Sequence, residues 1–135
     1  MSATLMLDTN AASGFIKSEA AIERLARDHD FCISVLTEAE LRFGLARGPV
    51  RAELRRLVEG FLDSADIRVW DSACARQYGR LRAELQASGR PLAPMDLMIA
   101  THALAAHCTL VTADRRFAAV PGLRVLDWRD PGAGH

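Results

Sequence analysis

The chain has 135 residues, half of them apolar, which is enough to bury the core of one domain, and nothing suggests a second. Its 17 basic and 17 acidic residues balance, so no global positive field favours a nucleic-acid partner. We expect no leader or membrane span, because no segment has the required apolar length. The cysteines have neither paired nor metal-ligand spacing, so we expect reduced core thiols in a cytoplasmic protein: Cys32, Cys74 and Cys108.

Residues 4–8 form a short apolar run without helical period, which is typical of a strand buried on both faces of a parallel sheet. The run ends at Asp8, followed by Thr9 and Asn10. Ligands of open α/β sheets bind at the carboxyl ends of the strands, so Asp8 is a candidate site residue. The alternative is that Asp8 only caps or turns the chain into the next helix.

The first half of the chain then alternates helical patterns with one further strand: a helical stretch at 10–27, a strand at 31–33, a helix from Ser34 or Thr37 to about Arg47, and a helix around 54–62. We expect the first helical stretch to break near Gly14 and to restart at a cap on Ser18. Gly48 and Pro49 end the helix before them.

The second half continues the alternation: a strand at 67–70, a helix from Asp71 or Ser72 to Gly89, an apolar helix at about 95–106, a strand at 109–112, a helical turn at 114–118 and a last strand at 123–126. The apolar helix has no polar face, so we expect it to be buried against the sheet. The whole pattern predicts an α/β fold with a mainly parallel central sheet and helices on both faces. Residues 131–135 are expected to be a disordered tail.

Acidic residues gather at one edge of the predicted sheet. Four of them follow the carboxyl ends of strands: Asp8, Asp71, Asp114 and Asp127. Only acids beside central strands could share a cleft, and spacing alone does not choose among the four. Two further candidates, Glu40 and Asp96, lie near the starts of helices, where a solvated helix face and a favourable interaction with the helix dipole are the respective alternatives.

Four motifs in order carry a more specific signal: Asp8-Thr9-Asn10, TEAELRFG at 37–44, GRPLAPMDLMIA at 89–100 and LVTADRRF at 110–117. Together they closely resemble the PIN-domain ribonucleases, and more narrowly the VapC toxins of bacterial toxin–antitoxin pairs. The resemblance covers nearly the whole chain, and it implies a single PIN-like domain over residues 1–130.

The resemblance assigns four catalytic carboxylates to one cluster that binds Mg²⁺ or Mn²⁺: Asp8, Glu40, Asp96 and Asp114. Hard divalent ions prefer oxygen ligands, and a bound ion can activate a water for attack on a phosphodiester. Without a cation, four close carboxylates would repel one another. Three polar residues would support the cluster, or serve only as local caps and turns: Thr9, Asn10 and Thr112.

Some neighbouring residues are excluded or depart from the family pattern. Glu38 competes with Glu40 for the family glutamate, but the Leu-Arg-Phe-Gly that follows fixes the match on Glu40, and Glu38 becomes a surface acid. Ala113 stands where the family usually has a polar residue, which leaves Asp114 itself in place. The histidines at 29, 102 and 107 have no ligand spacing, so we expect none of them in the site.

The resemblance therefore implies a metal-dependent endoribonuclease toxin that cuts structured RNA by water attack, leaves a 5′-phosphate and a 3′-hydroxyl, pairs as a homodimer and is neutralised by a cognate antitoxin. Because the net charge is zero, RNA affinity must come from local patches, and Arg115 and Arg116 beside Asp114 are candidate RNA contacts, with a solvated surface as the alternative. The alternative function is a non-catalytic PIN-fold binding module whose acidic cleft holds a partner's arginine.

Overall fold

The computed structural model describes residues 4–130, so the tail predicted at 131–135 lies outside the described residues. The elements in chain order are β1 (Leu5–Leu7), α1 (Thr9–Ile16), α2 (Ala20–Asp28), β2 (Phe31–Ser34), α3 (Val35–Ala46), α4 (Ala52–Ser64), β3 (Ile67–Arg68), α5 (Ser72–Ala87), α6 (Pro94–Ala105), β4 (Thr109–Val111), the 3₁₀ helix η1 (Arg115–Ala119) and β5 (Val125–Leu126). Among these residues, no helix has the length and apolarity needed to cross a membrane.

The five strands form one parallel sheet in the order β3-β2-β1-β4-β5, with β1 at its centre. Leu5 pairs with Phe31 on one side and Thr109 on the other, so β1, β2 and β4 run in register. Their carboxyl ends therefore meet at one edge of the sheet, which is where the candidate acids follow the strands.

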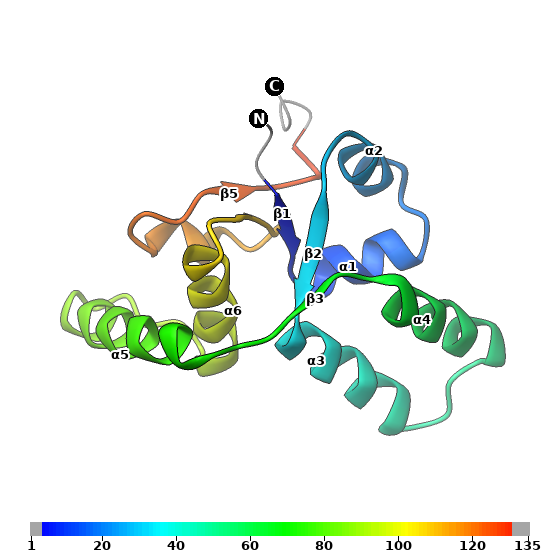
Figure 1. Ribbon diagram of the computed structural model, residues 1–135, viewed down its shortest axis with the longest axis horizontal. Helices are drawn as coiled ribbons and strands as arrows, with labels where there is room; N and C mark the ends of the chain where they lie inside the picture. Colours follow the sequence, from blue (N-terminus) through cyan, green and yellow to red (C-terminus); the bar gives the residue numbers. More distant parts are fainter. Residues whose placement is uncertain (1–3, 131–135) are drawn as a thin grey trace.

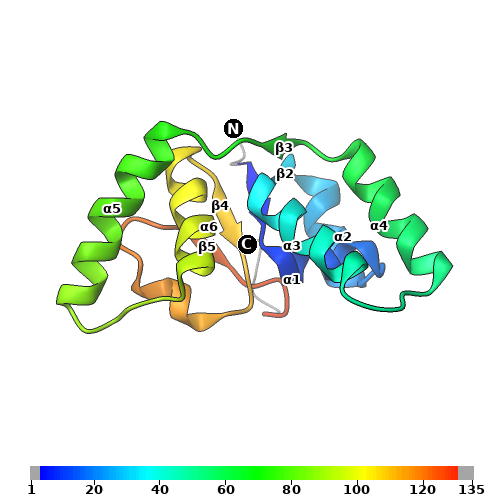
Figure 2. The same cartoon turned by 90° about the horizontal axis from the view of Figure 1, so that it is seen from below.

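Helices cover both faces of this sheet (Figures 1 and 2), and in both views α5 and α6 lie on one side of the strands while α1 to α4 lie on the other. Side chains that alternate along β1 enter the two cores. Leu5 and Leu7 pack in the core of α1 to α4, whereas Met6 packs in the core of α5 and α6. This double burial explains the continuous apolar run of β1, and it confirms the predicted α/β class with helices on both faces.

The apolar helix α6 is buried as predicted, and a hydrogen bond also joins it to α3. Pro94 begins the helix, which suits a position whose N–H would have no partner. The buried ring of His102 lies with its Nδ1 2.8 Å from Oγ of Ser34, the N-cap of α3. The start of α3 is thereby held to the last turn of α6, and the first turn of α6 carries Asp96 to the carboxyl edge of the sheet.

The predicted break at Gly14 is wrong, because Gly14 lies inside α1. The helix ends instead at residues 17–19, where Ser18 has a φ of 61° in the left-handed region. Ser18 is not the cap of α2 either. Glu19 precedes α2, and its side chain makes no capping hydrogen bond but accepts one from Nε1 of Trp128 at 3.2 Å.

Other differences are small. The strands predicted at 67–70 and 123–126 are present but have two residues each. The cysteines are buried free thiols, as predicted, and the Sγ atoms of Cys32 and Cys108 lie 3.9 Å apart.

Candidate functional site

One pocket at the carboxyl edge of the sheet contains all four carboxylates that the resemblance selected. Its volume is about 220 Å³, and it is lined by Asp8, Thr9, Asn10, Glu40, Asp96, Ile99, Asp114, Arg116 and Phe117. The other two strand-end acids are not part of it, because Asp71 follows β3 and Asp127 follows β5, the two edge strands. Asp71 instead caps α5 by accepting a hydrogen bond from the backbone N–H of Cys74 at 3.1 Å.

Asp8 lies at the buried end of the pocket, with only 8% of its surface exposed. It is also the N-cap of α1, because its Oδ1 accepts a hydrogen bond from the backbone N–H of Ala11 at 2.8 Å. Burial raises the pKa of Asp8, and hydrogen bonds from the hydroxyl of Thr112 and the N–H of Ala11 counteract this rise in part. The negative charges of Asp96 and Asp114 raise the pKa further. A cation in the pocket would relieve this unfavourable charge.

Glu40 reaches the pocket from α3, where it accepts a hydrogen bond from the hydroxyl of Thr9. This contact joins the end of β1 to the helix that follows β2. Glu38 lies on another side of α3 and forms an ion pair with Arg42 at 2.8 Å. The structure therefore places Glu40 in the pocket and leaves Glu38 at the surface.

Asp96 and Asp114 share one cation, the guanidinium of Arg116. Its Nη2 lies 2.6 Å from Oδ2 of Asp114 and 3.6 Å from Oδ2 of Asp96. Hydrogen bonds from Arg116 lower the pKa of Asp114, whereas burial raises the pKa of Asp96 and Arg116 only partly counteracts that effect. The sequence marked Arg116 as an RNA contact but gave no sign of these ion pairs.

The donor atoms of the pocket suit Mg²⁺ or Mn²⁺, since they are carboxylate oxygens. In the described part of the chain, however, no three Asp, Glu, His or Cys side chains are arranged to hold one ion. Two contacts occupy carboxylates of the pocket instead: Arg116 pairs with Asp96 and Asp114, and Thr9 donates a hydrogen bond to Glu40. The Arg116 side chain is 65% exposed and can turn outward, so the site fits a metal that replaces the guanidinium.

The three supporting residues have different surroundings. Thr9 donates to Glu40, and Thr112 bonds to Asp8 while its Oγ1 accepts from the backbone N–H of Asp114 at 3.1 Å. The exposed side chain of Asn10 makes no hydrogen bond with any other described residue and holds no carboxylate in place.

The sequence reasoning missed the apolar part of the lining. Ile99 and Phe117 complete the pocket, and each lies three residues after a site acid on a helical turn. Residues at that spacing share a helix face, which is the signal that could have found them.

Comparisons of the sequence with known proteins identify its family. The family described as PIN domain matches residues 5–123. The chain is similar to "tRNA(fMet)-specific endonuclease VapC" of Shigella flexneri, with 38% identity over 127 residues that cover 91% of this chain and 96% of the relative. It is also similar to "Ribonuclease VapC2" of Rickettsia felis, with 32% identity over 129 residues and the same coverage.

VapBC complexes are among the solved structures with the same fold. The chain matches VapBC from Salmonella typhimurium bound to DNA with a TM-score of 0.84 and 35% identity, covering 94% of this chain and 99% of that one. It matches VapBC2 from Rickettsia felis, bound to a DNA fragment from their promoter, with a TM-score of 0.81 and 31% identity, covering 90% and 96%.

Proposed function

The chain belongs to the PIN domain family, among its VapC ribonucleases, and we propose that it is a metal-dependent endoribonuclease toxin neutralised by a cognate antitoxin. The observation that carries the proposal is the single pocket that gathers Asp8, Glu40, Asp96 and Asp114 at the carboxyl edge of the sheet. Each of these acids comes from a different element, so only the folded chain creates the cluster.

The four carboxylates would hold Mg²⁺ or Mn²⁺, which supplies Lewis-acid stabilisation of the phosphodiester and an activated water. The chain's own residues keep the acids in position before the metal arrives. The Ala11 N–H and Thr112 fix Asp8, and Thr9 fixes Glu40. Preorganised ligands need little rearrangement during the reaction.

Arg116 contributes a cation that can exchange its partners. Its guanidinium now pairs with Asp114 and Asp96, and the same forked group binds a phosphate oxygen equally well. If the carboxylates held a metal, Arg116 would be released from them to contact the RNA backbone. Arg115, on the same 3₁₀ helix, remains a predicted contact to RNA.

The substrate is proposed to be structured RNA, and an initiator tRNA is the first candidate to test. Two relatives, 38% and 36% identical, are named tRNA(fMet)-specific endonucleases. The antitoxin is proposed from the VapBC complexes among the solved structures. The homodimer expected from the resemblance stays a prediction.

A second candidate function is a binding module whose acidic pocket holds a partner's arginine. The observation that favours it is Arg116 itself, because the pocket accommodates a guanidinium between Asp96 and Asp114. Such a module would bind a basic partner without cleaving RNA.

The deciding experiment incubates the purified chain with an initiator tRNA transcript and maps new 5′-phosphate ends. We expect cleavage in Mg²⁺ or Mn²⁺, none in EDTA, and recovery when metal is restored. Asp8→Asn should abolish cleavage, whereas Asp71→Asn, which alters a strand-end acid outside the pocket, should leave it unchanged. Cleavage that persists in EDTA, or in Asp8→Asn after contaminating nuclease is excluded, would contradict the proposal.

A further inference from the structure

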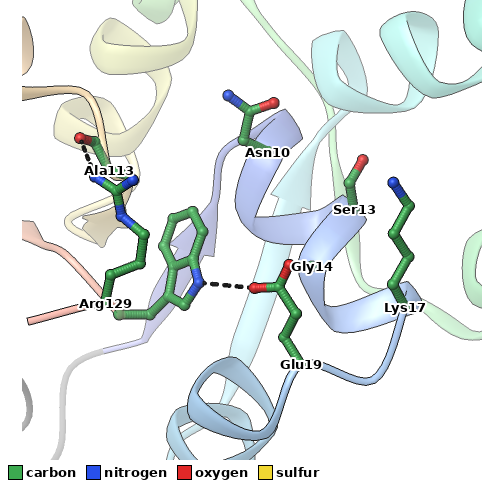
Figure 3. A pocket seen from close by; sticks show the side chains of 8 residues that line it. Asn10, Ser13, Gly14, Lys17, Glu19, Ala113 and Arg129 are labelled. Atoms are coloured by element: carbon green, nitrogen blue, oxygen red, sulfur yellow. Dashed lines mark hydrogen bonds between the residues drawn. The ribbon is translucent and has the colours of Figure 1, made fainter.

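A second pocket lies beside the acidic one. Its volume is about 360 Å³, and it is lined by Asn10, Ser13, Gly14, Lys17, Glu19, Ala113, Trp128 and Arg129 (Figure 3). Asn10 lines both pockets, and Ala113 directly precedes Asp114 of the acidic pocket. The two hollows are therefore neighbours along the carboxyl edge of the sheet.

One wall of this second pocket is a row of polar groups on α1 and at its C-terminal end. Asn10, Ser13 and Lys17 are spaced three and four residues apart, which places them along one helix face, and Figure 3 shows all three projecting from this segment. None of the three side chains forms a hydrogen bond or ion pair with another described residue. The row thus offers an amide, a hydroxyl and an ammonium group that are free to bind a ligand.

The opposite wall is a fixed cation. Nη2 of Arg129 donates to the carbonyl of Ala113 at 3.2 Å, and its Nε pairs with Asp127 at 3.4 Å. The guanidinium carbon also lies 5.9 Å from the centre of the Trp128 ring. These contacts hold Arg129 across the pocket from α1 and next to the start of the acidic pocket.

The carboxylate of Glu19 also lines the pocket, where it is held on the Trp128 side by a hydrogen bond from the buried indole. Nε1 of Trp128 donates to its Oε2 at 3.2 Å. The lining thus brings together two cations, Lys17 and Arg129, and one carboxylate, that of Glu19.

We propose that this pocket binds the RNA segment that adjoins the cleaved phosphodiester, with a backbone phosphate between Lys17, Ser13 and Arg129. The inference rests on the proposed function, because RNA whose phosphate lies over the carboxylates must continue along one of the flanking surfaces. The volume is within the range that accepts a small ligand, and Asn10, which lines both pockets, lies where they adjoin. An acidic peptide is the competing ligand. It would not explain why the row of Asn10, Ser13 and Lys17 begins at the acidic pocket, whose carboxylates would repel such a peptide.

The first test measures the binding of a fluorescein-labelled initiator tRNA transcript in EDTA, where cleavage is absent, as a function of KCl concentration. We expect Lys17→Gln to weaken binding roughly fivefold at moderate salt and to lower the slope of log affinity against log salt by about 0.7 to 0.9, the value for one lost phosphate contact. Arg80→Gln removes the same charge from exposed α5 on the other face of the sheet and should change neither quantity. Equal behaviour of the two variants, with both shown to be folded by circular dichroism, would overturn the inference.

The second test uses the fact that Lys17 is the only lysine of the chain. Acetylation of its ε-amine, measured by peptide mass spectrometry with the α-amine distinguished, reports on this pocket alone. We expect the tRNA to slow acetylation and poly-glutamate to have no such effect. Protection by poly-glutamate alone, or by neither, would overturn the inference while leaving cleavage by the parental chain intact. A parental chain that neither binds nor cleaves the tRNA would instead refute the proposed function, and the inference with it.

Discussion

Asp8→Asn is expected to abolish cleavage and, at the same time, to stabilise the metal-free protein. The substitution keeps the cap of α1, because the amide oxygen of Asn accepts the Ala11 N–H as well as a carboxylate does. It removes a charge that is disfavoured by burial and by the neighbouring Asp96 and Asp114. One change should therefore separate activity from stability.

The expected gain is about 1 kcal/mol in the free energy of unfolding, the usual size of a single-charge effect at a buried site. For a domain of this length it corresponds to a rise of about 4 °C in Tm. Because the pKa of Asp8 is raised above 3.8 in the folded state, the parent loses stability as the pH rises through that raised pKa. The advantage of Asp8→Asn is thus complete at neutral pH and disappears in acid.

The assay is thermal unfolding of both proteins at neutral pH, first in EDTA and then with Mn²⁺. Metal should raise the Tm of the parent, because it binds only the folded state, and should not raise that of Asp8→Asn. Asp71→Asn is the matched control: it alters another strand-end helix cap, but the pKa of Asp71 is lowered by its hydrogen bonds to Cys74, so no stabilisation is expected. A lower Tm for Asp8→Asn in EDTA would refute the account of charge strain in the pocket.

Three further predictions concern other contacts. Arg116→Ala removes the cation that competes for the carboxylates and should tighten Mn²⁺ binding several-fold in calorimetry without RNA; an unchanged affinity would mean that the guanidinium does not block the metal. Gly79→Ala should stabilise the protein by about 0.5 to 1 kcal/mol, because an added Cβ meets no heavy atom within 4 Å there. Gly14→Ala should lack this gain, because its Cβ would lie 3.0 Å from a carboxylate oxygen of Glu19, and equal urea midpoints for the two variants would contradict this. Ser34→Ala should cost about 1 to 2 kcal/mol, since it removes the cap of α3 and the partner of His102, and an unfolding curve identical to the parent's would rule out that role.

The sequence predicted the sheet and the buried helix well, because periodicity and apolar runs are local signals. The errors fall where distant residues decide the local structure. Gly14 looked like a helix breaker, yet its missing Cβ makes room for Glu19, which bonds to Trp128 109 residues later in the chain. Likewise, the strand predicted to reach Trp70 ends at Arg68, and the indole of Trp70 is fixed by a residue distant in the chain, since it donates to the carbonyl of Met98.

The family resemblance selected the candidate carboxylates. Spacing alone could not choose among the four acids that follow strands. Spacing could not choose because it does not give strand order: β1 and β4 are adjacent in the sheet, whereas β3 and β5 are its edges. The ion pairs of Arg116 and the second pocket depend on the directions of side chains, and no pattern in the sequence encodes these.

The shortness of the edge strands has a consequence for how this protein associates. β3 and β5 have two residues each, so neither edge of the sheet offers the row of free backbone N–H and C=O groups that strand addition requires. A second copy or an antitoxin must therefore dock through side chains of helices and loops. For the same reason, a chain separated from its antitoxin would resist the edge-to-edge polymerisation to which open sheets are prone.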